Sequence, residues 1–537
     1  MNYRLALCVL CCCIAPIKAQ QHDIVAVADT VFARWNSTHT PGCAVGVARD
    51  GKTLLGRGYG MADLETGTPI TVETIFESGS VAKQFTATAV VLLAMDSKLD
   101  LADPVRKFLP EFPQYERPIT IRHLLTHTSG LRDWSNLVAA AGWPRGTRAS
   151  AQADLLDILY RQKALNYPVG DFYSYTNSGF AVLMSLVERV SGKSFQDFTQ
   201  ENIFGPLGMR HTRWRDDFTR LVPGRAQAYS PARGGDWQLD MPFENVVGPG
   251  GLLTTVGDWL LWNDALTRNT LRPGHADSLT RRMKLTSGRE IQYALGLVVS
   301  SYRGVVEIGH SGSTGGYSTY LTRFPDRGNL SIAIQCNSSA GAATAYAHQL
   351  ADRLITDFPA PPQPDTTRVD AASFARSAGI YRSDRTRVLM QLPPVPPSQL
   401  RAMPNGWFRE PNDQRFRVEQ GADGKPVALF RATDDGDTTR FTWVTTQFWT
   451  PSVGDLQAFE GTYRSDEVAA TYTVKLVGDT LTYAVRPGVI LKLRPTVPDA
   501  FARGANAVWF SRDRSGRVTA MHFSEARMWD LTLPRLR

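Results

Sequence analysis

Cysteine is nearly absent from this sequence once its first residues are set aside. Four of the six cysteines lie within an apolar run from Leu5 to Ile17, which Arg4 precedes and Ala19 follows. A run this short cannot span a bilayer, and its flanks are those of a secretory leader. We therefore predict a signal peptide over residues 1–19, with an uncleaved interfacial anchor as the alternative.

Only Cys43 and Cys336 remain beyond this leader, which excludes a framework of several disulfides. Both lie in strand-like stretches, and an oxidising compartment could pair them if the two strands are neighbours. We expect two buried free thiols instead. No other segment offers the roughly 18 apolar residues of a spanning helix, so we expect an exported protein, periplasmic or secreted, without a stable membrane anchor.

The sequence lacks the residue patterns that are typical of several functional classes. The formal net charge is +8 and the pI is near 9.1, but the arginines are spread along the chain and form no basic run interleaved with aromatics. We therefore expect no nucleic-acid partner. There is no His-Glu-x-x-His or similar ligand spacing and no Gly-x-Ser-x-Gly, which disfavours a metallohydrolase and an α/β-hydrolase. We expect no metal and no cofactor.

Strand patterns lie near both ends of the first 360 residues, and helical patterns lie between them. From Ser80 to Met95 apolar residues recur on all faces, which is typical of a buried helix. The other predicted elements are a hairpin over 41–60, helices over 180–190, 256–266 and 342–355, and strands over 305–309, 316–324 and 330–336. This order predicts an α+β fold, with one antiparallel sheet flanked by helices beside an all-helical part.

A short repeat organises the rest of the chain. The sequence Gly-Ile-Tyr-Arg-Ser-Asp at 379–384 recurs as Gly-Thr-Tyr-Arg-Ser-Asp at 461–466, and each copy heads a stretch of short alternating strands. We predict two small antiparallel β-barrel domains, with one larger sandwich as the alternative. The predicted domains are 20–357, a proline-rich linker over 358–369, and barrels over 370–453 and 454–537.

Ser80 and Lys83 stand one helical turn apart at the start of the predicted buried helix, in the only Ser-x-x-Lys of the sequence. A serine alone is a weak nucleophile, but a nearby lysine can take its proton if burial lowers the pKa of the lysine. The helix dipole favours negative charge at the same end. The pair therefore predicts an activated nucleophile.

Two further segments carry groups that suit acyl transfer. Tyr175 could move protons and Asn177 could hold a substrate carbonyl, because both lie in a turn-rich loop that leads into a helix. On a late strand, Gly312 would let a substrate backbone approach. The main-chain N–H groups of Ser80 and Ser313 could then form an oxyanion hole.

The order Ser-x-x-Lys, Tyr-x-Asn, His-x-Gly resembles the serine β-lactamase and DD-peptidase superfamily of penicillin-recognising enzymes, nearest to its class C branch. The segments 120–131, 250–255 and 310–317 also resemble sequences of this superfamily, and the resemblance covers about residues 25–355. The two predicted barrels resemble the layout of the D-aminopeptidases of this superfamily. In that layout the barrels restrict access to the site.

Carried over by position, the implied catalytic residues are Ser80, Lys83 and Tyr175, and the implied substrate-binding residues are Asn177, His310 and Gly312. Ser80 would be acylated, Lys83 and Tyr175 would share the base and acid work, and Asn177 would orient the substrate amide. Where β-lactamases usually carry lysine, this chain has His310, whose cationic form should help to bind a substrate carboxylate. The exchange favours peptidase, aminopeptidase or esterase activity over efficient antibiotic hydrolysis.

The sequence therefore predicts a serine hydrolase that acts through an acyl-enzyme on peptides or amides with D-amino acids, or on small esters. Its partners would be such small substrates, cell-wall peptides among them. A β-lactamase is the alternative within the enzyme class. A non-catalytic binding or structural protein that keeps the fold is the alternative outside it.

A few further residues are expected to have structural roles or to approach the pocket from the C-terminal part. We expect structural roles for His127 and Ser129 in a loop, and a packed position for His123. The stretch from Pro498 to Asn506, which includes Arg503 and Gly504, is expected to reach the pocket from the second barrel, because a flexible basic turn interrupts two strand-like segments there. The alternative is that the barrels are an appendage for the cell wall or a partner.

Overall fold

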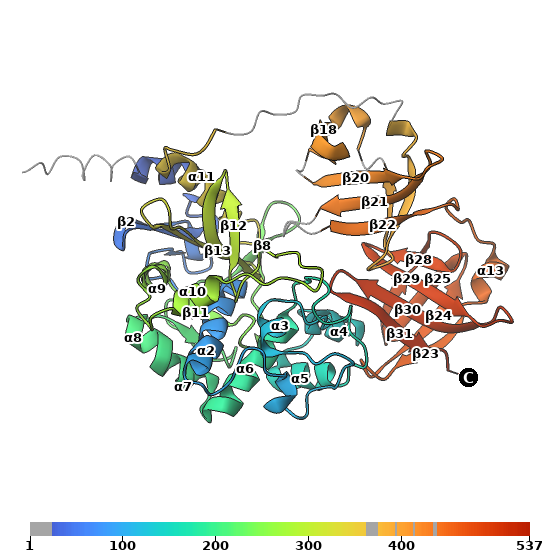
Figure 1. Cartoon of the computed structure of the whole chain (residues 1–537), viewed down its shortest axis with the longest axis horizontal. Coiled ribbons are helices and arrows are strands. Elements are labelled where there is room, and N and C mark those ends of the chain that lie inside the picture. The colour runs from blue at the N-terminus through green and yellow to red at the C-terminus, as the bar shows by residue number, and fades with distance from the viewer. Residues whose placement is uncertain (1–23, 361–373, 393–394, 412–413, 433–437, 537) are drawn as a thin grey trace, which may run out of the picture.

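The structure is a computed structural model that describes residues 24–360, 374–392, 395–411, 414–432 and 438–536. The predicted signal peptide and most of the predicted linker lie outside these residues. Figure 1 shows an N-terminal part in which a sheet lies on a group of helices, and two units of strands beside it. Among the helices of the described ranges, none has the length and apolar character needed to cross a membrane.

A six-stranded antiparallel sheet, in the order β12-β13-β14-β15-β1-β2, is the frame of the N-terminal part. Its strands are β1 (Cys43–Arg49), β2 (Lys52–Tyr59), β12 (Val298–Tyr302), β13 (Val305–Thr314), β14 (Tyr317–Phe324) and β15 (Leu330–Cys336). The predicted hairpin supplies β1 and β2, and the three predicted late strands supply β13, β14 and β15. The sheet is therefore built from both ends of this part, as the sequence predicts.

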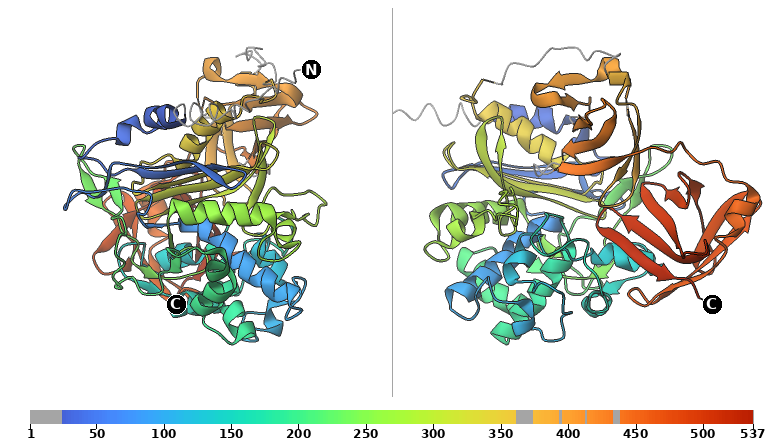
Figure 2. Two further views of the ribbon diagram at one scale, coloured as in Figure 1. Left: turned by 90° about the vertical axis from the view of Figure 1, so that its left-hand side faces the viewer. Right: turned by 45° about the vertical axis from the view of Figure 1, so that its right-hand side comes forward.

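Both faces of the central strand β1 are buried. Val45 and Val47 pack in one apolar cluster with helix α11 (Ala343–Leu354). On the opposite face, Gly46 lets helix α9 (Val256–Arg268) approach, since a Cβ there would lie 3.1 Å from Leu260 Cδ1. One helix thus covers each face of the sheet, and the views in Figure 2 show the sheet between its helices.

Helix α2 (Lys83–Met95) is the centre of the helical part, and every residue from Lys83 to Leu93 is buried. Ser80 lies just before it in η2 (Gly79–Ala82), a 3-10 turn, so the α-helix begins later than predicted. The other helices and turns are η1 (Ala33–Trp35), η3 (Val105–Lys107), α3 (Ile121–Leu125), α4 (Trp134–Ala140), α5 (Gln152–Tyr160), α6 (Asn177–Ser191), α7 (Phe195–Thr199), η4 (Gln200–Phe204), α8 (Gly205–Leu207) and α10 (His275–Thr280).

Short strands complete the N-terminal part. They are β3 (Met61–Asp63), β4 (Thr68–Pro69), β5 (Phe76–Glu77), β6 (Ser150–Ala151), β7 (Arg213–Trp214), β8 (Tyr229–Pro231), β9 (Trp237–Leu239), β10 (Glu244–Asn245) and β11 (Leu252–Thr254). Strand β5 leads directly into η2. It is fixed by its buried Glu77, which accepts hydrogen bonds from Arg215 Nε at 2.8 Å and Arg215 Nη2 at 2.9 Å. This buried ion pair holds the segment that carries Ser80.

Cys43 and Cys336 form a disulfide, so the expectation of two free thiols is wrong. The reason is the strand register, because β1 pairs with β15 and Cys43 lies directly opposite Cys336. Side chains that face each other across an antiparallel pair point to the same side of the sheet, within the reach of a disulfide. The bond therefore ties the first long strand of the chain to the last strand of the sheet.

The first C-terminal unit is one antiparallel sheet of seven strands, in the order β17-β16-β22-β21-β20-β19-β18. Its elements are β16 (Gly379–Ser383), β17 (Leu389–Leu392), η5 (Pro397–Gln399), β18 (Arg401–Met403), η6 (Pro404–Gly406), β19 (Trp407–Arg409), β20 (Arg415–Gln420), β21 (Pro426–Ala432) and β22 (Thr438–Val444). A small, largely aromatic core, with Phe374, Tyr381 and Phe416 among its buried residues, holds it together.

The second C-terminal unit has a four-stranded and a five-stranded antiparallel sheet. Its elements are α13 (Val453–Gln457), β23 (Gly461–Ser465), β24 (Ala470–Val477), β25 (Thr480–Arg486), β26 (Val489–Lys492), β27 (Arg494–Pro495), β28 (Ala500–Arg503), β29 (Asn506–Arg512), β30 (Val518–Glu525) and β31 (Met528–Pro534). A bridge between Tyr463 and Arg535 joins the two sheets, because it sets β23 beside β31. The α+β class followed by two antiparallel units agrees with the prediction. The predicted domain boundaries stay a prediction.

The repeated sequence has the same structural role in both units. Tyr381 and Tyr463 are fully buried, and each phenol donates to the carbonyl four residues earlier, at 2.7 Å and 2.8 Å. The glycine that opens each copy lies where a Cβ would meet a side-chain nitrogen, that of Trp443 at 2.7 Å and that of Arg535 at 2.8 Å. The repeat therefore marks the first strand of each unit, β16 and β23.

Candidate active site

The turn η2 and the start of α2 bring Ser80 and Lys83 together at the edge of the sheet. Lys83 Nζ lies 3.0 Å from Ser80 Oγ, 2.8 Å from Asn177 Oδ1 and 2.7 Å from the carbonyl oxygen of Pro249. The lysine side chain is completely buried. Its amine therefore has three polar neighbours, of which two can only accept hydrogen bonds.

Burial lowers the pKa of Lys83 well below its usual value, Asp133 opposes this shift, and the nearby charge of Arg527 adds to it. These effects favour the neutral amine. A neutral amine has two N–H groups and one lone pair. The two N–H groups suit the two obligate acceptors, Asn177 Oδ1 and Pro249 O, and the lone pair is left for the Ser80 hydroxyl. The hydrogen-bond pattern is thus that of a base poised to take the serine proton.

Asn177 is held by the helix that it begins. It is the first residue of α6, and its main-chain N–H donates to Asp133 Oδ2 at 2.7 Å. Asp133 also caps α4 and accepts from the N–H of Ser135 at 3.0 Å. Since Oδ1 of Asn177 is engaged by Lys83, only its Nδ2 group remains to bind a substrate carbonyl.

Tyr175 is partly buried beside the lysine, with Lys83 Nζ 4.8 Å from the centre of its ring. Its Oη atom has no hydrogen-bond partner of good geometry within the described residues. Burial raises the pKa of Tyr175, and this outweighs the opposing effect of the Ser80 hydroxyl. The phenol therefore keeps its proton at neutral pH, so it suits a proton donor better than a base.

Two glycines let strand β13 press against η2. Gly79 has a φ of 52°, in the left-handed region, and a Cβ on it would lie 2.5 Å from the N atom of Ser313. A Cβ on Gly312 would lie 2.1 Å from the Ser78 carbonyl oxygen. Both glycines are therefore needed for this close approach, which places Ser80 and Ser313 at the same cleft. Gly312 also lines that cleft, and its contact with a substrate backbone stays a prediction.

His310 is the predicted residue whose chemistry the structure changes most. Its Nδ1 lies 2.6 Å from the carbonyl oxygen of Ser311, an acceptor, so the ring proton is on Nδ1. Its Nε2 then accepts from the Tyr293 hydroxyl at 2.9 Å. Burial is the main cause that lowers the pKa of His310. These contacts and the burial of the ring favour the neutral imidazole, which argues against the expected cationic role.

A cleft of about 650 Å³ opens over these groups. It is lined by the predicted residues Ser80, Tyr175, Asn177, His310, Gly312 and Ser313. Lys83 lies beneath it, bonded to Ser80. A second cavity of about 260 Å³ also opens on Ser80, Asn177 and Ser313, so space for a bound molecule lies on two sides of the serine. Within the described ranges, no three histidine, cysteine or acidic side chains gather to hold a metal ion.

His123 lies within α3, and His127 and Ser129 lie in the segment that directly follows this helix. His123 Nδ1 lies 2.9 Å from the Thr120 hydroxyl in the capping box of α3. His127 has a φ of 57° and is buried, and its ring centre lies 4.3 Å from that of Tyr175. Ser129 Oγ accepts from the N–H of Leu131 at 3.3 Å. His127 therefore packs behind Tyr175, and His123 and Ser129 shape the chain around it.

The second C-terminal unit reaches the cleft, but not through the predicted stretch. Pro498 to Asn506 lines cavities shared with the first C-terminal unit and no part of the cleft at Ser80. The two-residue turn between β30 and β31 presents Arg527, which does line the cleft. The guanidinium carbon of Arg527 lies 5.0 Å from the centre of the Tyr175 ring.

Sequence reasoning missed three residues of this site, namely Asp133, Tyr293 and Arg527. Asp133 lies two residues beyond the segment matched to the superfamily, and a capping position before a helical stretch was a signal that could have found it. Tyr293 and Arg527 lie far along the chain from the motifs. No local pattern connects them with Ser80.

Comparisons with known proteins agree with this geometry. Residues 27–356 match the beta-lactamase family. A penicillin-binding protein of Bacillus subtilis is 27% identical over 378 residues, which are 66% of this chain and 82% of that protein. A D-aminopeptidase of Cereibacter sphaeroides is 30% identical over 354 residues, 64% of this chain and 66% of the relative.

A solved structure extends the fold comparison to the C-terminal units. The octameric penicillin-binding protein homologue from Pyrococcus abyssi has a TM-score of 0.55 and 19% identity, and the match covers 96% of this chain and 99% of the other. At this identity the likeness concerns the fold alone. From the family match and the site together, the chain belongs to the beta-lactamase family and is a serine hydrolase of the beta-lactamase fold.

Proposed function

We propose that this protein hydrolyses amides or esters of D-amino acids, or small esters, through an acyl-enzyme on Ser80. The observation that carries the proposal is the hydrogen-bond pattern of Lys83, whose buried amine has two obligate acceptors and one hydroxyl as neighbours. A base that is already neutral and aligned needs no rearrangement before it takes the serine proton.

In the proposed first step, the Lys83 amine accepts the proton of the Ser80 hydroxyl while Oγ attacks the substrate carbonyl carbon. The carbonyl oxygen becomes an oxyanion, which the main-chain N–H groups of Ser80 and Ser313 stabilise. The tetrahedral intermediate collapses when the leaving nitrogen or oxygen receives a proton from the Tyr175 phenol. Tyr175 recovers a proton from the lysine ammonium, so the acyl-enzyme forms with Lys83 neutral again.

In the second step, water attacks the acyl carbonyl and the same groups act in the opposite direction. Water gives its proton to the base, and the returning proton restores the Ser80 hydroxyl as the acid product leaves. The neutral His310 takes no proton in this scheme. It forms part of the cleft wall beside the phenol, with its ring centre 6.0 Å from that of Tyr175, and the buried Tyr293 holds it from behind.

The choice of D-amino acid substrates rests on the 30% identical relative named D-aminopeptidase. The two cavities on either side of Ser80 support it, because an acyl group and a leaving group would need separate space. Cell-wall peptides are a natural source of D-amino acids and are included in the proposed substrates. We also infer that the protein is exported, because the disulfide between Cys43 and Cys336 suits an oxidising compartment.

The test is a panel of N-acetyl-D-alanyl amides, the matching N-acetyl-L-alanyl amides, nitrophenyl esters and a fluorescent penicillin, with mass spectrometry of the protein after short incubation. We expect turnover of the D-amides or esters and an acyl adduct on the peptide that contains Ser80. Ser80→Ala should abolish both. The matched control is Ser301→Ala, at an exposed position on the edge strand β12. An adduct that persists in Ser80→Ala would contradict the proposed nucleophile.

A further inference from the structure

The geometry points to Arg527, in the second C-terminal unit, as a binding residue for a free carboxylate of the substrate. The inference rests on the proposed function and narrows its substrate class to molecules that carry such a carboxylate near the scissile bond. It gives the C-terminal unit a direct part in substrate choice.

The hairpin that presents Arg527 is held firmly on the N-terminal part. The carbonyl oxygen of Arg527 accepts from the main-chain N–H of Asp133 at 3.0 Å and from Asn166 Nδ2 at 3.1 Å. Asn166 Oδ1 in turn accepts from the N–H of Trp529 at 2.8 Å. The Glu525 carboxylate also accepts from the side-chain amide of Asn136. These contacts fix the backbone on both sides of the turn.

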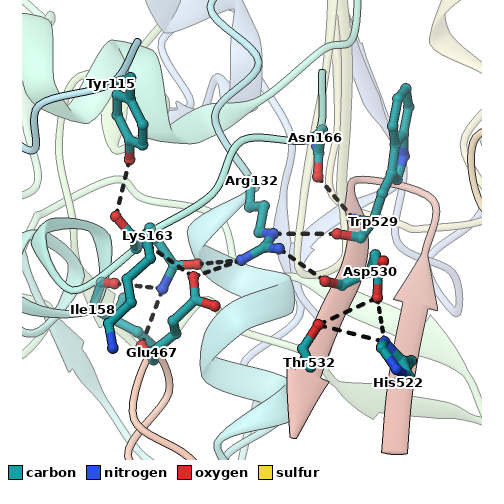
Figure 3. A network of polar contacts seen from close by, with 11 residues as sticks. Tyr115, Arg132, Ile158, Lys163, Asn166, Glu467, His522, Trp529, Asp530 and Thr532 are labelled. Carbon is teal, nitrogen blue, oxygen red and sulfur yellow. Dashed lines mark hydrogen bonds and ion pairs between the residues drawn. The ribbon is translucent and has the colours of Figure 1, made fainter. Parts of the chain in front are cut away.

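A buried arginine adds to this attachment, as Figure 3 shows. Arg132 is 2% exposed and pairs with Glu467 at 2.8 Å. Its Nε and Nη2 atoms donate to the carbonyl oxygens of Trp529 at 3.3 Å and Asp530 at 3.0 Å. Strand β31 is therefore bonded to the N-terminal part just beyond the turn. A group held in this way binds a ligand without first being ordered.

Only the backbone of Arg527 is used by these contacts, and its side chain is left for a ligand. The residue is exposed, it lines the cleft with Ser80, and its guanidinium lies over the Tyr175 ring. Among the residues that the structure describes, no carboxylate pairs with this guanidinium. A planar guanidinium with free N–H groups is the group best suited to a carboxylate.

The other cationic candidates are not available. The environments of Lys83 and His310 favour their neutral forms, as described above. Arg145, in the neighbouring cavity, pairs with Asp240 at 3.3 Å. No aspartate or glutamate is among the residues that line the cleft at Ser80. In the described part of the chain, Arg527 therefore supplies the charge of this cleft, which attracts a carboxylate and repels a free ammonium group.

The position of Arg527 over Tyr175 also argues against the aminopeptidase specificity that the name of the D-aminopeptidase relative indicates. An aminopeptidase must accept a free α-ammonium beside the scissile bond, and a cation over Tyr175 disfavours such a group in this cleft. A leaving group that ends in a carboxylate is favoured instead. The expected preference is thus that of a carboxypeptidase-like or acidic-ester hydrolase.

The experiment uses the full chain and a matched pair of esters. One is a benzoylglycyl ester of a 2-hydroxy acid with a free carboxylate, and the other is the primary amide of the same compound. Arg527→Gln should lower kcat/KM for the carboxylate about 10- to 100-fold, mainly through KM, and should change the amide less than about threefold. Arg527→Lys should restore part of the preference, because it keeps the charge.

The control is Arg517→Gln, which removes the same charge from a position 82% exposed next to β30. It should leave both substrates unchanged. Equal losses on the two esters in Arg527→Gln, or an unaltered preference, would overturn the inference.

A binding measurement keeps this test independent of turnover. In a Ser80→Ala background, calorimetry compares benzoylglycyl-D-alanine with its carboxamide, and each is measured again with Arg527→Gln added. When Arg527 is present, we expect benzoylglycyl-D-alanine to bind at least about 10-fold more tightly than its carboxamide. With Arg527→Gln, this difference should disappear. Equal binding of the two compounds to the Arg527 protein would refute the carboxylate site. Absence of Ser80-dependent turnover would refute the proposed function. The carboxylate site would still be tested separately by the binding measurement.

Discussion

The disulfide between Cys43 and Cys336 allows a quantitative prediction about the stability of the N-terminal part. It closes a loop of 293 residues. In the chain-entropy model, a cross-link over this length lowers the entropy of the unfolded chain enough to stabilise the folded state by about 5 to 6 kcal/mol. In the folded state the backbones of the two strands are already paired, so the bond adds little there. Most of its effect is therefore on the unfolded chain.

The assay is urea denaturation of the oxidised protein, the reduced protein and a Cys43→Ala/Cys336→Ala variant. For a urea m-value of about 3 kcal/mol per M, the loss of the cross-link should lower the midpoint by about 2 M. The m-value should rise on reduction, because an unfolded chain without the cross-link is more expanded. The double variant should respond to a reductant no further.

Two results would refute this reasoning. Intact mass spectrometry that finds two free thiols in protein from an oxidising compartment would remove the cross-link itself. Equal midpoints for the oxidised and reduced protein would show that the cross-link does not destabilise the unfolded chain as the chain-entropy model requires. In either case the strand register, rather than the sulfur chemistry, would carry the stability of the sheet.

Three further predictions concern the site and the interface. Tyr175→Phe should lower the acylation rate by about two to four orders of magnitude, as expected for the loss of a positioned acid, and stopped-flow acylation would measure it; wild-type rates would exclude the phenol. For a neutral ester, kcat/KM should fall as acid protonates Lys83 and should level off at a pH well below that expected of an ordinary lysine, because burial lowers the pKa of this base. A rate that climbs until about pH 10 would indicate an ordinary lysine. Arg132→Met should cost about 3 to 5 kcal/mol, because it leaves Glu467 without its partner in the interface, and urea denaturation with limited proteolysis of the second C-terminal unit would detect this.

Much of the fold and the heart of the site could be predicted because their signals are local. Ser80 and Lys83 are three residues apart, and Tyr175 and Asn177 are two apart, so one turn of chain fixes each pair. The strands that frame them carry their own patterns of apolar residues. The repeat at 379 and 461 likewise marks its strands by a buried tyrosine. Each of these features is settled within a few residues of sequence.

What the sequence could not supply depends on register and burial. The state of Cys43 and Cys336 follows from which residues face each other across two strands that are far apart in the chain. The preference of His310 for the neutral form follows from its contact with Tyr293 and from its burial. Arg527 reaches Tyr175 because a whole unit docks on α4 and the loops around it. These are properties of the packed molecule, and no motif encodes them.

The two-residue turn that carries Arg527 also has a consequence for how such enzymes diverge. Ala526 and Arg527 are both exposed, and the hairpin is anchored by main-chain groups on either side. An allele that replaces Arg527 or shortens the turn would leave the Ser80 and Lys83 side chains themselves in place. Mutations in this turn would therefore change which substrates the enzyme prefers without abolishing its activity. The last two strands of the chain are thus a site at which substrate range could evolve.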